Sequence, residues 1–511
     1  MKLATRKAIA AGILLAVGLM GFSSPASAAK KAVSINQTSM VVAEGVPPQT
    51  FDPIQSSQIA TMYAWQSVYE GLVIAGLDGK IQPVLASKWT ISKDGLTYDF
   101  TLRQGVQFSN GALLTADDVV YSFERLKAKG LPYSQARFAT IASVTKIAND
   151  QVRFVLSSPT AGFLLNLGSP YLIGSAIVNK KWTESNDPKL MMMGTGPFQM
   201  VSYSPNQQLI LKRNELYWNK KSLDTVANLT IRYMPDQSAQ VAALQAGQID
   251  LMFPNAESFL QIKRISTIRT VAVNSASTIR LNIGTNNAPL DDVNVRRAIS
   301  LALDRRGIVK GAFLGQAVPS AQIPPAYAWS IPINQLQYQR VNVAAAKKLL
   351  AKAGYPKGIQ LTLNHLAGYA TYLDRFAEIV KQQLAKAGIV VTIEANQNAV
   401  WLDKQNKANY QIMTNEYAFN GDPLFYLSPR PGRQGPNPAE LDALIAAVST
   451  GDPDNYTDGL RKIQIMEDDL VFPDITVAAR KAWAAYGSNL TKVKLSPTLS
   501  RSFLASIKAK K

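Results

Sequence analysis

The second half of the chain alternates helix-like and strand-like segments, and this alternation restricts the fold more than any other feature. Apolar residues recur at helical spacing over 295–309 and 344–356. The strand-like IQLTLNHL follows at 359–366, then a helical stretch at 375–388 and two more strand-like segments. Strands that alternate with helices of about ten to fifteen residues favour a parallel or mixed sheet with helices on its faces. We therefore predict an α/β domain here.

The first half is richer in strands. TYDFTLR at 97–103 alternates apolar and polar side chains, as a half-buried strand does. A helix is predicted to begin after Thr115, a good capping residue, and to end at Gly130. Helical spacing over 57–74 predicts another helix. From about residue 480 the tail returns to short strands, which we expect to rejoin an earlier domain.

The N-terminus has the pattern of a secretory signal peptide. A positively charged start is followed by an apolar run at 8–22 and by Ala26-Ser27-Ala28, a small-residue cleavage site. A membrane anchor is the alternative, but this run is short of the roughly 20 residues that span a bilayer. We expect cleavage near Ala28, an exported soluble protein, and a mature chain that begins at Ala29.

The chain has no cysteine and is strongly basic. The lack of cysteine excludes disulfides, zinc–thiolate sites and a cysteine nucleophile. The net charge is +19, and removing the three cations of the signal peptide leaves +16. The basic residues are scattered and form no arginine-rich arm, so we predict no nucleic-acid partner. The positive charge leaves open the possibility of an anionic ligand.

No motif for catalysis or for a cofactor is present. The sequence lacks GxSxG, a P-loop and a GxGxxG between strand and helix. The single histidine, His365, lies in a predicted strand and is interpreted as structural. The adjacent methionines 191–193 cannot easily converge on one metal ion from an extended segment, so packing is favoured. We predict a protein that is not an enzyme and needs no cofactor, although a hydrolase with two distant carboxylates stays open.

One long segment carries a family resemblance. PVLASKWTISKDGLTYDFTLRQGVQFSNGALLTADDVVYSFERL, residues 83–126, resembles the signature of the family 5 extracellular solute-binding proteins. These are periplasmic receptors of ATP-binding-cassette (ABC) importers for peptides, nickel and some sugars. Further matches follow in the family's order: FDP (51–53), YEGL (69–72), GTGPF (194–198), NELYW (214–218), ALQAGQIDL (243–251) and VRRAISLALDR (295–305).

The resemblance implies a two-lobed α/β clamshell, class II-like and of cluster C, with an extra strand-rich domain inserted in the first lobe. The implied boundaries are 1–28 for the signal peptide, 29–73 with 195–284 and 476–511 for a discontinuous first lobe, 74–194 for the inserted domain, and 285–475 for the second lobe. Ligand contacts to both lobes would stabilise the shut form, which the importer recognises. This family mechanism requires no covalent chemistry.

The resemblance also points to the segment around EYAFNGDP. Peptide-binding members keep an aspartate three residues before an Asp/Glu-Pro, and this aspartate pairs with the ligand's α-ammonium. Phe419 stands at that position here, Glu416 stands where the family has tryptophan, and a one-residue slip would bring in Asn420. The pattern of a peptide receptor is therefore broken at its defining residue. If Glu416 faces the cleft, we expect it to select a ligand cation or hydroxyl.

We therefore predict a periplasmic binding protein that captures a small organic solute, such as a sugar derivative, an opine-like conjugate or a small anion. An oligopeptide or dipeptide is the alternative, and a nickel chelate a weaker one. The expected partner is an inner-membrane ABC permease; the protein is expected to be a monomer, without a lipid-anchoring cysteine. Core packing is the alternative role for each aromatic candidate. The candidate ligand-binding residues are Val46, Pro47, Pro48, Phe51, Trp401, Glu416, Tyr417, Ala418, Phe419, Asn420 and Asp422.

Overall fold

The computed structural model describes residues 39–509, apart from 57, 369, 419–421, 425–436, 452–454, 492 and 499. The predicted signal peptide, its cleavage site and the candidates Phe419 and Asn420 lie outside the described residues.

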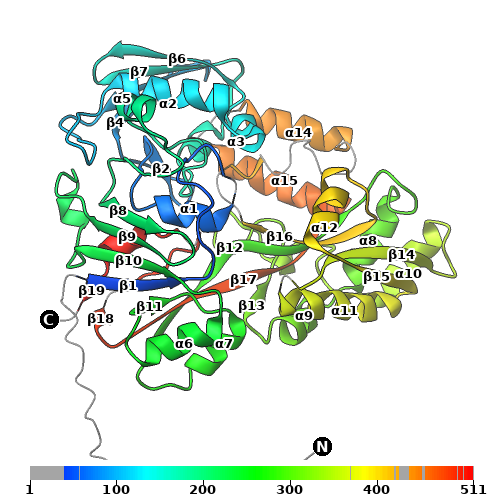
Figure 1. Cartoon of the computed structure of the whole chain (residues 1–511). Coiled ribbons are helices and arrows are strands. Elements are labelled where there is room, and N and C mark those ends of the chain that lie inside the picture. The colour runs from blue at the N-terminus through cyan, green and yellow to red at the C-terminus, as the bar shows by residue number, and fades with distance from the viewer. Residues whose placement is uncertain are drawn as a thin grey trace, which may run out of the picture. The chain divides into compact units, whose positions relative to one another are not determined.

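One 11-stranded sheet runs through the described chain (Figure 1). Its strands, in spatial order, are β15 (Ile389–Asn396), β14 (Ile359–Leu366), β16 (Ile412–Ala418), β12 (Arg269–Ile283), β17 (Asp474–Tyr486), β11 (Leu251–Met252), β1 (Ser39–Glu44), β10 (Asn228–Tyr233), β9 (Gln208–Arg213) and β8 (Phe198–Ser204), with β13 (Ala317–Pro319) paired to β17. The predicted strands of the second half lie at one end, and β1 lies towards the other. We call the part built on β14–β16 the second lobe and the part built on β1 and β8–β11 the first lobe.

The long strands β12 and β17 belong to both lobes and pair antiparallel with each other. Their ladder changes register at two places, and the larger change lies between Asn274 and Thr278. Asn274 pairs with Lys481 and Thr278 pairs with Ala479, so three residues of β12 stand opposite the single residue Arg480. This is a β-bulge, a feature that bends a strand and re-aims a side chain.

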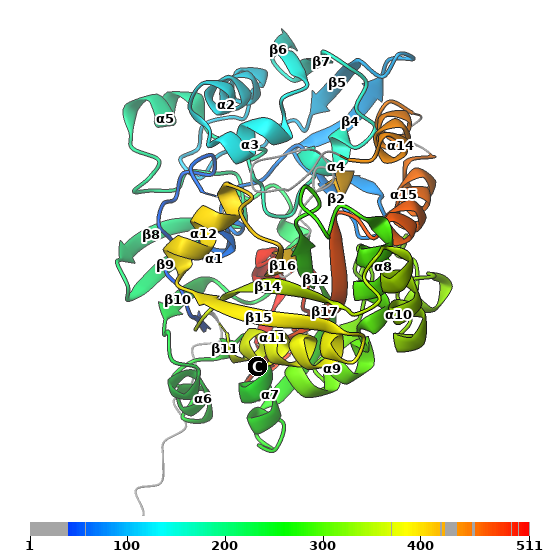
Figure 2. The ribbon, with the colours of Figure 1, turned by 90° about the vertical axis from the view of Figure 1, so that its right-hand side faces the viewer.

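The second lobe has its own core. Strands β14 and β15 are covered by α11 (Thr371–Ala385), which contacts α9 (Arg305–Ala312); α8 (Val293–Ala302) packs on α10 (Val343–Lys352) (Figure 2). The single helix predicted over 295–309 is wrong in one respect, because it breaks at Leu303. Asp304 then caps α9 by accepting a hydrogen bond from the backbone N–H of Gly307 (3.0 Å).

The first lobe packs β1 and β8–β11 around α1 (Ile59–Trp65), α6 (Gln237–Gln245) and α7 (Ala256–Ile262). The helix predicted over 57–74 ends at Trp65, because the carbonyl groups of Ser67 and Val68 bond instead to the 194–198 loop. Gly194 is required there, since a Cβ would lie 2.0 Å from the Val68 carbonyl oxygen. The chain's tail rejoins this core through Leu490, Leu504 and Ile507, as expected.

A separate four-stranded sheet lies between β3 and β8 in the sequence, and we call it, with its helices, the inserted region. Its strands, in spatial order, are β4 (Ala86–Ile91), β5 (Thr97–Leu102), β7 (Gln151–Leu156) and β6 (Ile141–Ala148). Helix α2 (Ala116–Lys129) packs on β6 and β7. Thr115 and Asp118 form a capping box at its start, which confirms the predicted helix and cap.

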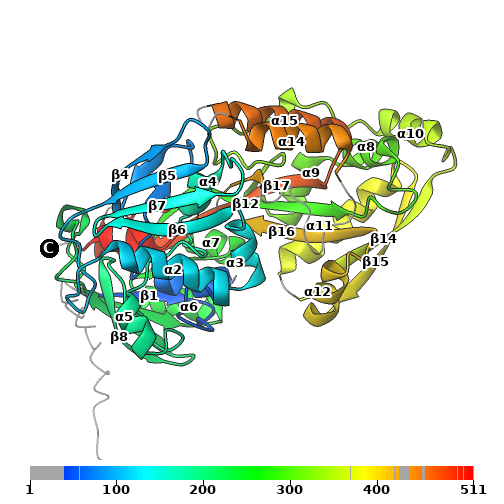
Figure 3. The ribbon, with the colours of Figure 1, turned by 90° about the horizontal axis from the view of Figure 1, so that it is seen from above.

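Two helices, α14 (Ala439–Ser449) and α15 (Tyr456–Leu470), and several short elements complete the described chain. In Figure 3, α14 and α15 lie side by side above β17. Among the described residues, no helix combines the length and apolar content that a membrane span needs. The bounds of the elements not yet given are β2 (Val73–Ala75), β3 (Ile81–Pro83), α3 (Pro132–Arg137), α4 (Phe163–Leu167), α5 (Lys180–Ser185), α12 (Asn398–Asn406), β18 (Leu490–Thr491), β19 (Lys508–Ala509) and the 3-10 helices Lys220–Ser222, Ile333–Gln335 and Ser502–Ser506.

Candidate ligand-binding site

An ion pair lies where the two long strands lose their pairing. The Nε atom of Arg480, on β17 opposite the bulge, is 2.7 Å from Oε1 of Glu416 on β16. The hydroxyl of Tyr372, on α11, donates a hydrogen bond to Oε2 of Glu416 (2.7 Å). The Glu416 side chain is 16% exposed and that of Arg480 is 31% exposed. Glu416 is thus largely buried and is neutralised by groups of the protein itself.

A second ion pair comes from the first lobe. Arg501, near the C-terminus, places Nε 2.5 Å from Oε1 of Glu44, the last residue of β1. The Arg501 guanidinium lies 3.9 Å from the centre of the Tyr63 ring and 3.3 Å from that of Phe253. A buried cation is stable only when it is paired and bonded, and this arginine has both a carboxylate and two aromatic faces.

Tyr63, on α1, lies close to both ion pairs. Burial raises the pKa of Tyr63 to about 12, and the charges that act on its hydroxyl are Arg501, Glu44, Arg480 and Glu416. Charges from both lobes and from the crossing strand therefore act on one phenol. We call this group the junction cluster; it consists of Glu44, Tyr63, Phe253, Tyr372, Glu416, Arg480 and Arg501.

Further contacts join the first and second lobes beside the cluster. Glu257 of α7 accepts hydrogen bonds from Nη2 of Arg375 (2.9 Å) and from the hydroxyl of Thr371 (3.3 Å), both on α11. Burial, the largest single influence, acts to raise the pKa of Glu257, but the hydrogen bonds from Arg375, Thr371 and the backbone and the charge of Arg375 together lower it. Trp483, three residues beyond Arg480, stacks on Phe259 of α7 with ring centres 4.9 Å apart.

The candidates predicted after the first strand differ in exposure, and Pro48 and Phe51 both contact Tyr203. Val46 is 56% exposed, Pro47 is half-buried and Pro48 is buried. Phe51 is fully buried, and its ring packs edge-on against Tyr203 with centres 4.9 Å apart. Phe51 therefore has a core-packing role in this structure, the alternative weighed for each aromatic candidate.

The candidates in the second lobe lie in different surroundings. Of these, Glu416 belongs to the junction cluster. Tyr417 lies under the guanidinium of the buried Arg280 at 4.6 Å, and Ala418 is half-buried at the end of β16. Asp422 is buried, and burial raises its pKa. Trp401 lies in a small apolar cluster on α12 and is 7% exposed.

His365 has structural partners on both ring nitrogens. Its Nε2 lies 2.6 Å from Oδ1 of Asp374, and its Nδ1 lies 3.1 Å from the hydroxyl of Thr414. The ring is buried. These contacts agree with the structural role that the sequence predicted.

Most of the junction cluster was not predicted from the sequence. Glu44 is the last residue of β1, and Arg480 stands beside Lys481 in the middle of the largely apolar strand DITVAARKAWAAY. A charge inside such a strand is a usable signal, because charged side chains are rarely buried without a partner. Arg501 carries no comparable signal, since its partner is 457 positions away.

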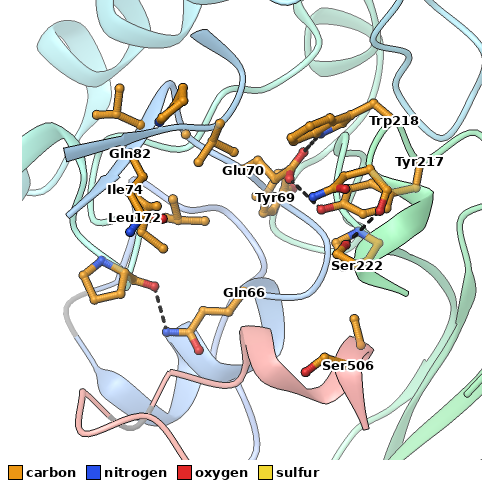
Figure 4. Close-up of a pocket in the computed structure, with 18 of the residues that line it drawn as sticks. Gln66, Tyr69, Glu70, Ile74, Gln82, Leu172, Tyr217, Trp218, Ser222 and Ser506 are labelled. Carbon is orange, nitrogen blue, oxygen red and sulfur yellow. Dashed lines mark hydrogen bonds between the residues drawn. The ribbon is translucent and has the colours of Figure 1, made fainter. Parts of the chain in front are cut away.

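A cavity of about 320 Å³ lies elsewhere, between the first lobe and the inserted region (Figure 4). Glu70 stands in its wall and accepts hydrogen bonds from Thr195, Tyr217 and Trp218 at 2.9 to 3.1 Å. Burial raises the pKa of Glu70 to about 7, although these bonds act in the opposite direction. Among the described residues, those that line this cavity include none from the second lobe, so we regard the junction cluster as the better candidate for a site between lobes.

Comparison with known proteins identifies the family. Residues 80–436 match the model of the bacterial extracellular solute-binding proteins, family 5. The chain belongs to this family, has its two-lobed periplasmic-binding-protein fold, and is the binding protein of an ABC importer rather than an enzyme. Such proteins bind small ligands or peptides and deliver them to a permease.

Individual relatives are similar over most of their length. The glutathione-binding protein GsiB of Salmonella paratyphi A is 28% identical, over 91% of this chain and 93% of that protein. The dipeptide-binding protein of Escherichia coli K12 is 29% identical, over 77% and 78%. The structure of HbpA2 from Haemophilus parasuis superposes with a TM-score of 0.79 at 24% identity, covering 92% of this chain and all of that one.

Proposed function

We propose that this protein captures a small organic solute with at least one anionic group at the junction cluster and carries it to an inner-membrane permease. The observation that carries the proposal is that two ion pairs, Arg480 with Glu416 and Arg501 with Glu44, both act electrostatically on Tyr63. Groups from both lobes meet there, and a solute that touches both stabilises their closed arrangement.

Arg480 is proposed as the anchor for the anionic group. Its side chain is the most exposed of the four charged side chains, at 31%. A planar guanidinium matches a carboxylate with two parallel hydrogen bonds. Tyr63, Phe253 and Tyr372 supply ring surfaces for the organic body of the solute, as is common in small-molecule sites.

The state of Glu416 disfavours a free amino terminus as the main recognition element. Its carboxylate is already paired with Arg480 and bonded by Tyr372, so a ligand ammonium would have to compete with both. The relatives support two ligand classes. The glutathione-binding relative favours an amino-acid conjugate with carboxylates, and the dipeptide-binding relative keeps linear peptides as the second candidate.

The proposal includes export and organisation. A signal peptide, residues 1–28, would be removed in the periplasm, and the protein would act there as a monomer. The proposed first lobe (29–73, 195–284 and 476–511), inserted domain (74–194) and second lobe (285–475) are supported by separate hydrophobic cores. The segment around Tyr171–Val178 also adds buried side chains to the first-lobe core.

Thermal unfolding of the purified mature protein tests the proposal. Glutathione, the dipeptide Met-Leu and nickel–histidine are added separately, each over a range of concentrations. We expect glutathione to stabilise the protein, by about 2.7 kcal/mol at a hundredfold excess over its Kd. Stabilisation by Met-Leu alone would replace the proposal with the peptide alternative, and stabilisation by nickel–histidine alone would replace it with metal-chelate transport.

A further inference from the structure

The inserted region contacts the second lobe directly, at a place apart from the junction cluster. The backbone N–H of Asp422, which follows β16, donates to Oδ1 of Asn166 on α4 (3.1 Å). The backbone N–H of Ala161 donates to the carbonyl oxygen of Ser449, the last residue of α14 (2.6 Å). The turn that begins α4 therefore lies directly against the second lobe.

Gly162 lies at the closest point of this contact. A Cβ on Gly162 would stand 2.0 Å from Oδ2 of Asp422 and 2.7 Å from the hydroxyl of Tyr456. Both distances are far below van der Waals contact. The backbone of Gly162 has φ −81° and ψ 6°, values that alanine adopts without strain. Glycine is thus required by the approach of the second lobe and not by the local conformation.

Both sides of the contact are held by bonds of their own. On the second-lobe side, the Asp422 carboxylate accepts bonds from the Tyr456 hydroxyl and the Leu424 N–H. On the other side, Asn166 also accepts a bond from Nη1 of the buried Arg137 (3.4 Å). Around these bonds, Leu165 of α4 packs with Leu424 and Tyr456 of the second lobe in one hydrophobic cluster, so the two surfaces fit closely where they meet.

We infer that Gly162 and Asn166 are positioning residues for solute capture: they let the inserted region meet Asp422 when the lobes close. The missing side chain at Gly162 sets how far the lobes approach, and Asn166 supplies a hydrogen bond made only in the closed arrangement. This inference rests on the proposed function, because the closure it permits is the one that encloses the solute. It assigns Asp422 to lobe contact and not to direct ligand binding.

The test compares Gly162→Ala with Gly45→Ala. Gly45 has open space around it and no positive φ, so it controls for the added methyl group. The chain has no cysteine, so Ile147→Cys and Val390→Cys can carry spin labels without further changes. These positions are 48% and 56% exposed and lie on the inserted region and the second lobe. Pulsed electron paramagnetic resonance then measures the distance between the labels.

We expect Gly162→Ala to lengthen the distance between the labels and to weaken glutathione binding about tenfold or more, while Gly45→Ala behaves as wild type. The double variant Gly162→Ala/Asp422→Ala should shorten the distance again, because it removes the carboxylate that the new Cβ meets most closely. A purely structural defect predicts no such rescue. Unchanged distance and affinity in Gly162→Ala would overturn the inference.

The inference can be tested even if Gly162→Ala does not fold or if the wild type does not bind glutathione. If Gly162→Ala fails to fold, Asn166→Ala replaces it; a longer distance supports the inference and an unchanged one overturns it. If glutathione does not bind the wild type but Gly162→Ala still lengthens the distance, the proposed ligand is wrong and the lobe contact stands.

Discussion

Arg480 of β17 reaches across β12 to Glu416 of β16, and their Nε and Oε1 atoms lie 2.7 Å apart. The pair therefore spans the strand that connects the two lobes. A cation in this position can exchange part of its pairing with Glu416 for the carboxylate of an incoming solute.

Replacing Arg480 by glutamine is expected to weaken glutathione binding roughly ten- to hundredfold. A hydrogen bond to a charged group contributes about 1.5 to 3 kcal/mol, and each 1.4 kcal/mol is tenfold in Kd. Titration calorimetry on the folded variant measures the change. Lys481→Gln removes the same charge from the next residue, whose side chain points to the opposite face of β17, and should leave Kd unchanged. Equal weakening by both variants would mean that only net charge matters.

Replacing Glu44 by alanine is expected to lower the free energy of unfolding by about 3 kcal/mol. The change leaves the Arg501 guanidinium, 5% exposed, without its carboxylate, and an unpaired buried charge is costly. Urea denaturation at neutral pH measures the loss. Asp99→Ala is the matched control, because its pair with Arg153 is exposed and should contribute less than about 1 kcal/mol. Similar losses in both variants would contradict the assignment.

The free energy of unfolding should fall as the pH rises from 4.5 to 7, and Glu70 should account for part of the fall. Its pKa is raised from 4.5 to about 7 by burial, so in this window the unfolded chain releases a proton that the folded protein keeps. Stability therefore decreases with rising pH, by at most about 1.4 kcal/mol per pH unit from this group. Urea denaturation at several pH values measures the slope.

Glu70→Gln should flatten that slope, because glutamine does not titrate. Replacing the exposed Glu124 serves as the control, because it removes a carboxylate away from Glu70, in the inserted region. An equal slope in wild type and Glu70→Gln would show that Glu70 does not titrate in this window.

Local patterns predicted the elements well where the chain's own neighbours determine them. Thr115 correctly marked the start of α2, the alternation of TYDFTLR located β5, and the strand-like IQLTLNHL located β14. The predictions were wrong where distant backbone competes. The helix after residue 57 stops early because Ser67 and Val68 bond to the 194–198 loop, and that pairing leaves no trace in the local sequence.

The candidate site was harder to predict for the same reason. Counting residues back from Asp422 led to Glu416, which belongs to the junction cluster, but it could not reveal the partner Arg480. Glu44 and Arg501 lie near opposite ends of the chain and meet only because β1 and the C-terminal tail share one core. Phe51 shows the converse, since an aromatic residue predicted as a ligand contact fills that core instead.

The β-bulge opposite Arg480 has a mechanical consequence. One sheet passes through both lobes, and it resists bending wherever its strands are fully hydrogen-bonded. It bends most easily at the bulge, where three residues of β12 face one residue of β17. A solute held by Arg480 would therefore bind at the place where the sheet bends most easily, so that binding acts directly on the bend. Substitutions that tighten the bulge should then stiffen the hinge and slow both capture and release, even though they touch neither the solute nor the lobe surfaces.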